Sequence, residues 1–380
     1  MTEPSSAAAD QFLKVPTKRN RDPRLDFFRG VGMFIILLAH IPFDRWALWI
    51  PARFGFSDAT EMFVFQSGMA SAIAFGGTFD RNGGLALVAR VAQRVWQIYW
   101  AHIALFITVV ALMTVAGTRP DGVTYLDSLN LVPFIEDPGR LLGALLTLQY
   151  VPNYFDILPM YIVVLALLPV MLFAERLHRL LPLALMLVLW LPAQFGLLNL
   201  PAEPWSDRSW FFDPFGWQLL FFTGFFLMRG TLTAPGFDRS LMVVAILIVL
   251  ASVPFSWVRF HEMHPFFHQA AQHIAFLTDK TTFGLLRFIH FLALSYTVVH
   301  LVGEHGSRLK GPVVRVMRVV GQQSLAVFIT SMVLAQIIGI GLDLSGRGLL
   351  VEALGNLAGF GVLIGIAYGV RWFKQMPWKA

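Results

Sequence analysis

The chain has 380 residues, of which 56% are hydrophobic and 14% are charged, and its formal net charge is +6. Soluble domains carry about 25% charged residues, so the composition excludes an ordinary soluble protein and indicates an integral membrane protein. There is no cysteine, which excludes disulfide bonds and a thiolate nucleophile. The positive charge is typical of segments that flank membrane helices and requires no nucleic acid as a partner.

The chain begins with a polar stretch that contains several prolines. Residues 1–23 include Pro4, Pro16 and Pro23, and we expect them to form a disordered cytoplasmic tail. No cleavable signal precedes the first apolar run, so that run is expected to remain as a helix. We expect residues 24–380 to form a single transmembrane domain.

Ten apolar runs follow the tail. A hydrocarbon core needs about 20 apolar residues per helix, and each run meets or approaches that length. The pattern predicts an all-α, polytopic integral membrane protein with about ten transmembrane helices. The runs cover residues 27–43, 57–77, 96–116, 157–174, 180–198, 215–230, 240–257, 285–303, 322–341 and 349–371.

The distribution of Lys and Arg gives these runs an orientation. If the N-terminus is cytoplasmic, most Lys and Arg residues fall in inner segments, and most acidic residues fall in outer loops. This bias follows the positive-inside rule and predicts that both termini are cytoplasmic. The long segments 117–156 and 258–284 then lie outside, where such loops often carry function.

The first run contains two polar side chains that a bilayer disfavours. Arg29 and His40 are eleven positions apart, which is about 16 Å and about three turns of a helix, so both lie on one face. Ionisable groups inside a membrane are functional candidates by default. Alternatively, Arg29 reaches lipid headgroups, and His40 is a packed histidine with a single hydrogen bond.

The second run opens with two acidic residues. Asp58 and Glu61 share a helix face near the predicted outer surface, where a carboxylate can orient an imidazole. Helix capping by Ser57 and Asp58 is the alternative interpretation. Capping does not explain Glu61, whose neighbours are apolar.

Two outer segments place further polar groups beside predicted helices. The stretch LQYVPNYFDILPMY (148–161) carries Gln149, Asn153 and Asp156, which turn chemistry around prolines also explains.

The other segment is DKTTFGLLRFIHF (279–291), which carries Asp279, Lys280, Arg287 and His290. Arg287 and His290 are one helical turn apart, so one face presents a cation and an imidazole within the membrane. A purely structural role is the alternative.

Four outer histidines have spacings that suggest a metal site. No acidic or cysteine partner accompanies them, and histidine is common at interfaces, so we expect no metal site and no permanently bound cofactor. These residues are His261, His264, His268 and His273.

The buried polar groups fit acyl transfer. The chain has no cysteine, and no serine lies in a nucleophile-elbow motif. His40 is therefore the candidate general base that deprotonates an acceptor hydroxyl, with Asp58 and Glu61 as its catalytic partners. A covalent acyl-histidine intermediate is the less economical alternative.

Six blocks of the sequence together resemble a known family. They run in the expected order from about residue 21 to 335, and they are similar to the OpgC-type membrane succinyltransferases that modify osmoregulated periplasmic glucans. An arginine followed by a histidine in the first helix is also similar to the wider acyltransferase-three-like membrane proteins. The blocks are RDPRLDFFRG, FGFSDATEMFVFQSG, QYVPNYFDILPMY, FDPFGWQLLFFTGF, DKTTFGLLRFIHFLALSY and GQQSLAVF.

The resemblance implies an enzyme of the bacterial inner membrane whose active site opens toward the periplasm. It implies succinyl-CoA as the cytoplasmic donor co-substrate and a hydroxyl of a periplasmic glucan as the acceptor. Two positions depart from the family pattern, since Ala39 stands where an acid is expected and Gln323 where a histidine is expected. The first departure makes Asp58 or Asp44 the expected partner of His40.

The resemblance also implies roles in substrate binding. We expect cytoplasmic arginines to bind the CoA phosphates, Lys280 or Arg287 to bind the succinyl carboxylate, and outer aromatic rings to contact the glucan. The candidate arginines are Arg24, Arg29, Arg90 and Arg94, and the candidate rings are Tyr154, Trp205, Trp210 and Trp217. The expected substrate-binding residues are Arg24, Arg29, Gln149, Asn153, Asp156, Trp217, Gln218, Asp279, Lys280, Arg287 and His290.

Other functions remain open on the sequence alone. A transporter or flippase for a glucan, lipid or small anion would use the same buried charges as relay points, although the chain has no evident internal repeat. An acetyl-CoA-dependent O-acetyltransferase that acts on another envelope polysaccharide is a further alternative. The lipid bilayer is an expected partner in each case, and a homodimer is also open.

Overall fold

The computed structural model describes residues 22–376, apart from the side chain of residue 304. Most of the expected tail, residues 1–21, lies outside the described residues, as do residues 377–380 of the expected transmembrane domain. Within residues 22–376 the chain forms helices and connecting segments, and the β-structure consists of two isolated bridges. The predicted all-α class is confirmed.

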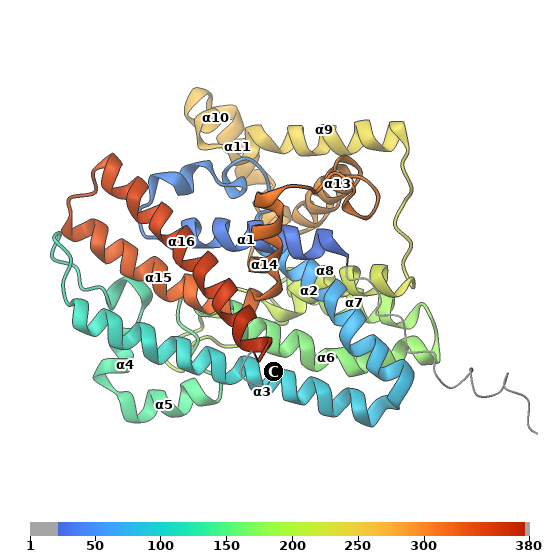
Figure 1. Ribbon diagram of the computed structural model, residues 1–380, viewed down its shortest axis with the longest axis horizontal. Helices are drawn as coiled ribbons and strands as arrows, with labels where there is room; N and C mark the ends of the chain where they lie inside the picture. The colour runs from blue at the N-terminus through green and yellow to red at the C-terminus, as the bar shows by residue number, and fades with distance from the viewer. Residues whose placement is uncertain (1–21, 377–380) are drawn as a thin grey trace, which may run out of the picture.

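Helices of very different length follow one another along the chain (Figure 1). The longer ones are α1 (Pro23–His40), α2 (Ala59–Ser71), α3 (Gly77–Ala116), α6 (Ile157–Leu177), α7 (Leu181–Gln194), α8 (Pro214–Arg229), α9 (Arg239–Ser256), α13 (Leu285–Val302), α14 (Pro312–Gln322), α15 (Ser324–Leu344) and α16 (Leu349–Lys374). The short α-helices are α4 (Val132–Glu136), α5 (Pro138–Leu146), α10 (Val258–Met263), α11 (Pro265–His273) and α12 (Ala275–Thr278). A π-helical turn, η3 (Ala72–Gly76), joins α2 to α3, and the 3₁₀ turns are η1 (Arg45–Trp49), η2 (Pro51–Arg53), η4 (Asp127–Leu129) and η5 (Glu304–Gly306).

Aspartate side chains begin several of the longer helices. Asp22, Asp213 and Asp238 each accept a hydrogen bond from a backbone N–H in the first turn of α1, α8 and α9. A capping carboxylate satisfies a donor that the helix itself leaves unpaired and interacts favourably with the helix dipole. Proline follows the cap in α1 and α8, where its fixed φ suits the first helical position.

Each of the ten predicted apolar runs overlaps a helix. Within residues 22–376, six helical stretches are long and apolar enough to cross a membrane. The structure thus supports a helical membrane protein, while ten spans and the cytoplasmic position of the termini remain predictions. The six stretches are Ala59–Ala116, Ile157–Leu177, Arg239–Ser256, Leu285–Val302, Ser324–Leu344 and Leu349–Lys374.

The longest stretch, Ala59–Ala116, contains the second and third predicted runs. Gly83 interrupts it with φ 79° and ψ −175°, a conformation that glycine adopts far more readily than other residues. Figure 1 shows the chain changing direction between α2 and the main part of α3. The two predicted runs are therefore separate helical segments that a glycine joins directly.

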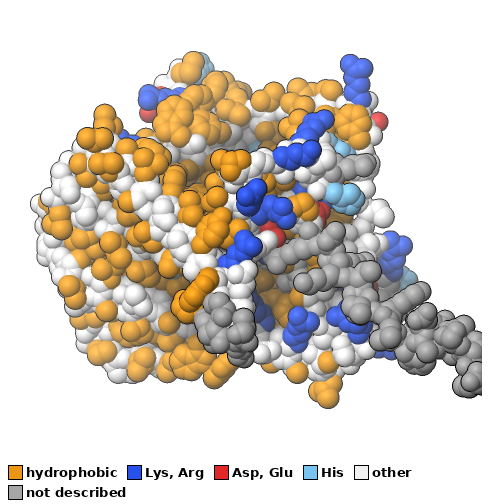
Figure 2. All heavy atoms as spheres, viewed as in Figure 1, with side chains coloured by type: hydrophobic (Ala, Val, Ile, Leu, Met, Phe, Trp, Pro, Cys, Tyr) orange, Lys and Arg blue, Asp and Glu red, His pale blue; other side chains and the backbone are white. Residues whose placement is uncertain are grey.

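α1 lies near the centre of the bundle and packs against α2, α14 and α15. Further pairs surround this core, including α2 with α8, α3 with α6, and α15 with α16. Figure 2 shows hydrophobic side chains over much of the viewed face, while its Lys and Arg side chains lie mainly in the right half. We call the end of the bundle that contains Arg29 the arginine end, and the end that contains His40 the histidine end.

Candidate functional site

His40 is the last residue of α1 and is partly exposed. Its Nδ1 lies 2.7 Å from the carbonyl oxygen of Ile36. A carbonyl oxygen only accepts hydrogen bonds, so Nδ1 carries the proton and Nε2 of the neutral ring keeps a lone pair. The expected partners of His40 were the carboxylates Asp44 or Asp58, and a backbone carbonyl takes their place in orienting the ring.

Tyr154 contacts the ring of His40. The ring centroids are 5.2 Å apart, with an interplanar angle of 78°. The Tyr154 hydroxyl donates a hydrogen bond to the carbonyl of Met332 in α15. Its backbone φ is 89°, which is rare for a residue with a Cβ and typical of sites where surrounding contacts hold a strained backbone. Tyr154 thus fixes one side of the His40 ring.

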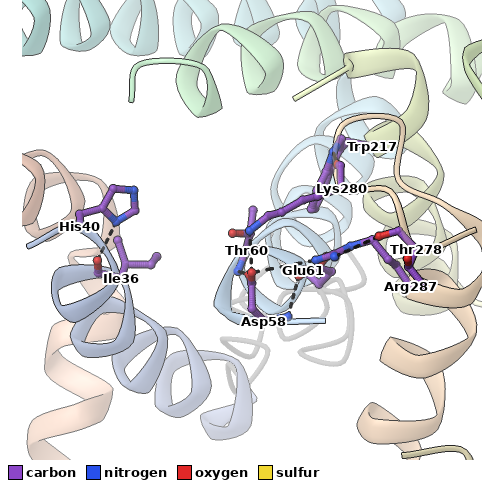
Figure 3. Close-up of polar contacts among 9 residues, drawn as sticks. All are labelled: Ile36, His40, Asp58, Thr60, Glu61, Trp217, Thr278, Lys280 and Arg287. Carbon is purple, nitrogen blue, oxygen red and sulfur yellow. Dashed lines mark hydrogen bonds and ion pairs between the residues drawn. The ribbon is translucent and has the colours of Figure 1, made fainter. Parts of the chain in front are cut away.

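Four charged side chains form a cluster across from His40, and Figure 3 shows that they lie apart from its ring. Lys280 pairs with Asp58 at 2.6 Å, and Arg287 pairs with Glu61 at 2.5 Å. A longer contact of 4.0 Å joins Arg287 to Asp58. Two cations thus match two carboxylates, and α2 is joined to α13 and the segment that precedes it.

The acids of this cluster also cap α2. Asp58 accepts a hydrogen bond from the N–H of Thr60 at 2.6 Å, and Glu61 accepts one from the N–H of Asp58 at 2.7 Å. This is a capping box with both halves present. Capping is therefore the correct interpretation, and it includes the fully buried Glu61, which was expected to need another explanation. The two acids pair with cations instead of orienting the His40 ring.

The segment 278–284 carries Lys280 to the cluster, and indole and amide side chains hold its backbone in place. Trp217 donates to the carbonyl of Lys280 at 2.9 Å, and Gln194 donates to that of Thr282 at 2.7 Å. Asp279 accepts from the N–H of Thr282 at 2.7 Å. Trp217 is fully buried, so it positions Lys280 and offers no face to a sugar.

His290 follows Arg287 by one turn and is buried. Its Nδ1 lies 2.7 Å from the hydroxyl of Ser57, while its Nε2 is buried without a hydrogen-bond partner among the described residues. A Cβ on Gly55 would come within 2.6 Å of that Nε2. The absence of a side chain at Gly55 thus lets the loop before α2 close over the imidazole.

Arg29 is buried near the other end of α1. It donates to the carbonyl of Gln66 at 3.0 Å and lies 3.4 Å from the hydroxyl of Ser67. Arg29 lines a cavity of about 340 Å³ together with Arg90 and Arg94 of α3. Three of the four arginines expected to bind phosphate therefore share one cavity. The fourth, Arg24, instead pairs with Asp22 at 2.7 Å.

The cavity also contains polar side chains that the sequence analysis did not single out. Gln93, Gln97, Tyr161 and Ser324 line it. A signal for two of them was present, because Arg90, Gln93, Arg94 and Gln97 recur at the spacing of one helix face. Such a polar stripe beside an apolar run is a recognisable mark of a lined cavity.

An aromatic pair limits the cavity on the side toward His40. Phe63 and Phe328 both line it, and their rings stack with centroids 6.2 Å apart. One turn beyond Phe328 in α15 is Met332, which binds Tyr154 beside His40. His40 is not among the residues that line the cavity. Along α15, Phe328 therefore lies between the cavity residue Leu325 and the Met332 carbonyl beside Tyr154.

The remaining expected residues lie away from the four-charge cluster. Gln149 and Asn153 are exposed, and Asn153 accepts a hydrogen bond from Arg208 at 3.3 Å. Asp156 is buried and accepts from the N–H of Phe211 at 3.1 Å. Burial raises the pKa of the Asp156 carboxyl to about 6, although that hydrogen bond opposes the increase.

Two of the aromatic residues expected to contact the glucan, and one amide residue expected to bind substrate, are enclosed by protein. Trp210 is 2% exposed, and Trp217 and Gln218 are fully buried. Gln218 donates to the carbonyl of Met186 at 2.7 Å. Trp205 is 44% exposed, so it keeps a surface that a ligand can reach.

The four outer histidines lie on and around α10 and α11, and of these His261 is partly buried while the other three are exposed. His261 and His268 make a ring contact with centroids 5.8 Å apart. Among the described residues, no group of three or more His, Cys, Asp or Glu side chains is arranged to hold a metal ion.

These side chains are suited to proton transfer at one end of α1 and to anion binding at the other. The open Nε2 of His40 can accept a proton from a hydroxyl. The arginines of the cavity can bind phosphate oxygens, and guanidinium groups do so with two parallel hydrogen bonds.

A comparison with known families gives one match. The model of a family described as OpgC protein matches residues 21–375. No curated protein matches the chain, and no solved structure matches it.

Proposed function

Because this chain belongs to the OpgC protein family, a family of membrane transferases that modify glucans, we propose that it transfers a succinyl group from cytoplasmic succinyl-CoA to periplasmic glucan hydroxyls. The observation that carries the proposal is the state of His40. Its Nδ1 is held by the Ile36 carbonyl at 2.7 Å, which leaves Nε2 as the basic nitrogen, at the opposite end of α1 from the arginine cavity.

The transfer uses His40 as a general base and then as a general acid. Nε2 removes the proton from the acceptor hydroxyl as its oxygen attacks the thioester carbonyl carbon. The tetrahedral intermediate then collapses, the carbon–sulfur bond breaks, and the thiolate takes the proton from Nε2. The products are the succinyl ester and free CoA, and the imidazole returns to its starting state. The hydrogen bond to Ile36 keeps the ring in one tautomer throughout.

The donor is bound from the arginine end. Arg29, Arg90 and Arg94 provide guanidinium groups for the CoA phosphates. The pantetheine arm is long and narrow, so it can reach His40 while the nucleotide stays in the cavity. Phe63 and Phe328 stand in its way, and in this mechanism their rings move apart as the arm enters.

Lys280 is the cation best suited to the succinyl carboxylate. Its side chain is 29% exposed, whereas that of Arg287 is 11% exposed and is paired with the buried Glu61. A carboxylate bound beside Lys280 would gain a charge-assisted hydrogen bond. We therefore assign carboxylate binding to Lys280 and assign Arg287 to holding α2 and α13 together.

The test uses purified protein in lipid nanodiscs with succinyl-CoA labelled in its acyl group. Addition of a periplasmic glucan should give labelled ester and an equal amount of free CoA. Acetyl-CoA under the same conditions should react more slowly. Equal rates with both donors would contradict the succinyl assignment, and movement of glucan without release of CoA would favour a transporter.

A further inference from the structure

An exposed phenylalanine follows the helix that carries His40. Phe43 has 69% of its surface exposed, and its φ is 58°, in the left-handed region that residues other than glycine seldom adopt. Strained residues of this kind persist where surrounding contacts hold them, and they gather at ligand-binding places. The backbone of Phe43 is therefore held in a costly conformation while its ring faces outward.

Contacts on both sides of Phe43 hold its backbone. Arg347 donates from Nη1 to the carbonyl of Pro42 at 2.8 Å. On the other side, the guanidinium of Arg45 pairs with Glu352 of α16 at 2.8 Å. These contacts hold the backbone through the neighbours of Phe43 and do not use its ring.

Two guanidinium groups lie over the ring of Phe43. The Cζ atoms of Arg119 and Arg347 are 4.7 Å and 5.5 Å from its centroid. Both groups approach the carboxylate of Asp343, Arg347 at 2.7 Å and Arg119 at 4.0 Å. The shared carboxylate holds both guanidiniums at the ring. Phe43 nevertheless keeps 69% of its surface exposed, so most of its ring remains open to a ligand.

The rim of this open ring is polar and balanced in charge. Arg119 also pairs with Asp121 at 2.9 Å, and the hydroxyl of Tyr125 donates to Asp343 at 3.0 Å. Each of the two arginines is matched by a carboxylate, so the rim favours no anion. An aromatic face with planar donors and acceptors around it suits a neutral ligand that has C–H groups on one face and hydroxyls at its edges.

The ring lies beyond His40 when viewed from the arginine cavity. Phe43 is three residues after His40, and three residues span at most about 11 Å. α15 follows the same order, since Leu325 lines the cavity, Met332 binds Tyr154 and Asp343 binds Arg347. Donor cavity, imidazole and exposed ring therefore succeed one another along the bundle.

We propose that Phe43, with Arg119, Arg347 and Asp343 at its rim, is an acceptor subsite on which a neutral pyranose ring stacks. This inference rests on the proposed function and adds to it the place where the sugar binds. The C–H groups on one face of the pyranose contact the open ring face, and the rim binds its hydroxyls. The next sugar along the chain then presents a hydroxyl to Nε2 of His40.

The test compares two exposed aromatic residues on the same loop. Trp49 is 74% exposed and serves as the matched control, because Phe54 is its ring neighbour at 6.2 Å and no arginine lies over its ring among the described residues. Phe43→Leu should raise the KM for glucan about fivefold to tenfold, with the KM for succinyl-CoA unchanged. Phe43→Trp should stay near the wild-type value, and so should Trp49→Leu.

Three results would overturn the inference: an unchanged glucan KM in Phe43→Leu, a Phe43→Trp variant as impaired as Phe43→Leu, or an equal rise in Trp49→Leu. The last result would show that the rings anchor the loop in lipid. Direct binding of a glucan oligosaccharide in a His40→Asn background separates this inference from the proposed function. Weaker binding after Phe43→Leu supports the subsite even if no succinyl transfer is found.

Discussion

The regions around His40 and His290 contain similar residue types in opposite states. His290 is 3% exposed, its Nδ1 is paired with Ser57, and Gly55 closes over its Nε2. His40 is partly exposed, and its Nδ1 is held by the Ile36 carbonyl, which leaves Nε2 as the nitrogen with a lone pair. A general base must reach the proton that it removes. Only the environment of His40 allows that.

The charged groups near the two histidines differ in the same way. Beside His290, Arg287 and Glu61 are buried and paired, and breaking such a pair costs more than forming it gains. Beside His40, the contacts are a backbone carbonyl and the ring of Tyr154, which orient the imidazole without adding a charge. The region of His290 is suited to holding helices together, and that of His40 is suited to the proposed reaction. The following variants test that division.

The largest effect is expected at His40. His40→Asn keeps an N–H that can donate to the Ile36 carbonyl, but it removes the basic nitrogen. Loss of a general base lowers the rate by about 10²-fold to 10⁴-fold, so succinyl transfer should fall by that amount while the protein stays folded. The rate is measured with labelled succinyl-CoA, and folding by thermal unfolding in detergent. Transfer at more than a tenth of the wild-type rate would remove His40 as the base.

The next effect is on stability, at the buried ion pair. Arg287→Met leaves the Glu61 carboxylate buried without its main partner, which costs about 3–5 kcal/mol. We expect a large decrease in the thermal unfolding temperature. Adding Glu61→Gln should raise the unfolding temperature part of the way back to the wild-type value, because the unpaired charge is then gone.

The matched control for that variant is an exposed pair. Arg259 and Glu262 lie 3.5 Å apart with side chains that are 71% and 60% exposed, so Arg259→Met should change the free energy of unfolding by less than about 1 kcal/mol. An equally small effect for Arg287→Met would mean that the Arg287–Glu61 pair does not hold α2 to α13.

The sequence predicted the helical elements and the charged residues within them, but not how those charges pair. Arg29 and His40 were expected on one helix, and both lie in α1, with His40 as its last residue. The acids that open α2 were expected beside His40, and they instead form one cluster with the cations that precede and begin α13. Charges in apolar runs need partners, so the presence of two acids and two cations in the predicted outer half of the membrane was itself informative.

What the sequence could not reveal depends on backbone geometry. The partner of His40 Nδ1 is a carbonyl, which every residue possesses, so no side-chain pattern marks it. The open ring of Phe43 depends on a positive φ and on Arg119 and Arg347, which are far apart in the chain. The change of direction at Gly83 likewise takes place without the longer polar loop that usually separates two membrane runs.

A moderate effect on donor choice is expected at Lys280. Lys280→Met removes the charge assigned to the succinyl carboxylate, and a hydrogen bond to a charged group contributes about 1.5–3 kcal/mol. The rate with succinyl-CoA should therefore fall at least tenfold relative to the rate with acetyl-CoA, while Lys280→Arg should keep most of the preference. Parallel losses with both donors would assign Lys280 to structure, together with Arg287.

The smallest effect is expected at Asp156, where the pKa of the folded state is raised to about 6 from 3.8. The folded protein then binds more protons than the unfolded chain between about pH 4 and pH 6, so the free energy of unfolding falls as the pH rises through that range. Asp156→Asn removes this dependence and keeps an oxygen that can accept from the N–H of Phe211. The variant should be at least as stable as wild type at pH 7, and its advantage should shrink toward pH 4, as measured by thermal unfolding at each pH. Its KM for glucan should be unchanged, because Asp156 is buried and holds the loop at Phe211. A raised KM would instead support the expected role of Asp156 in binding the acceptor.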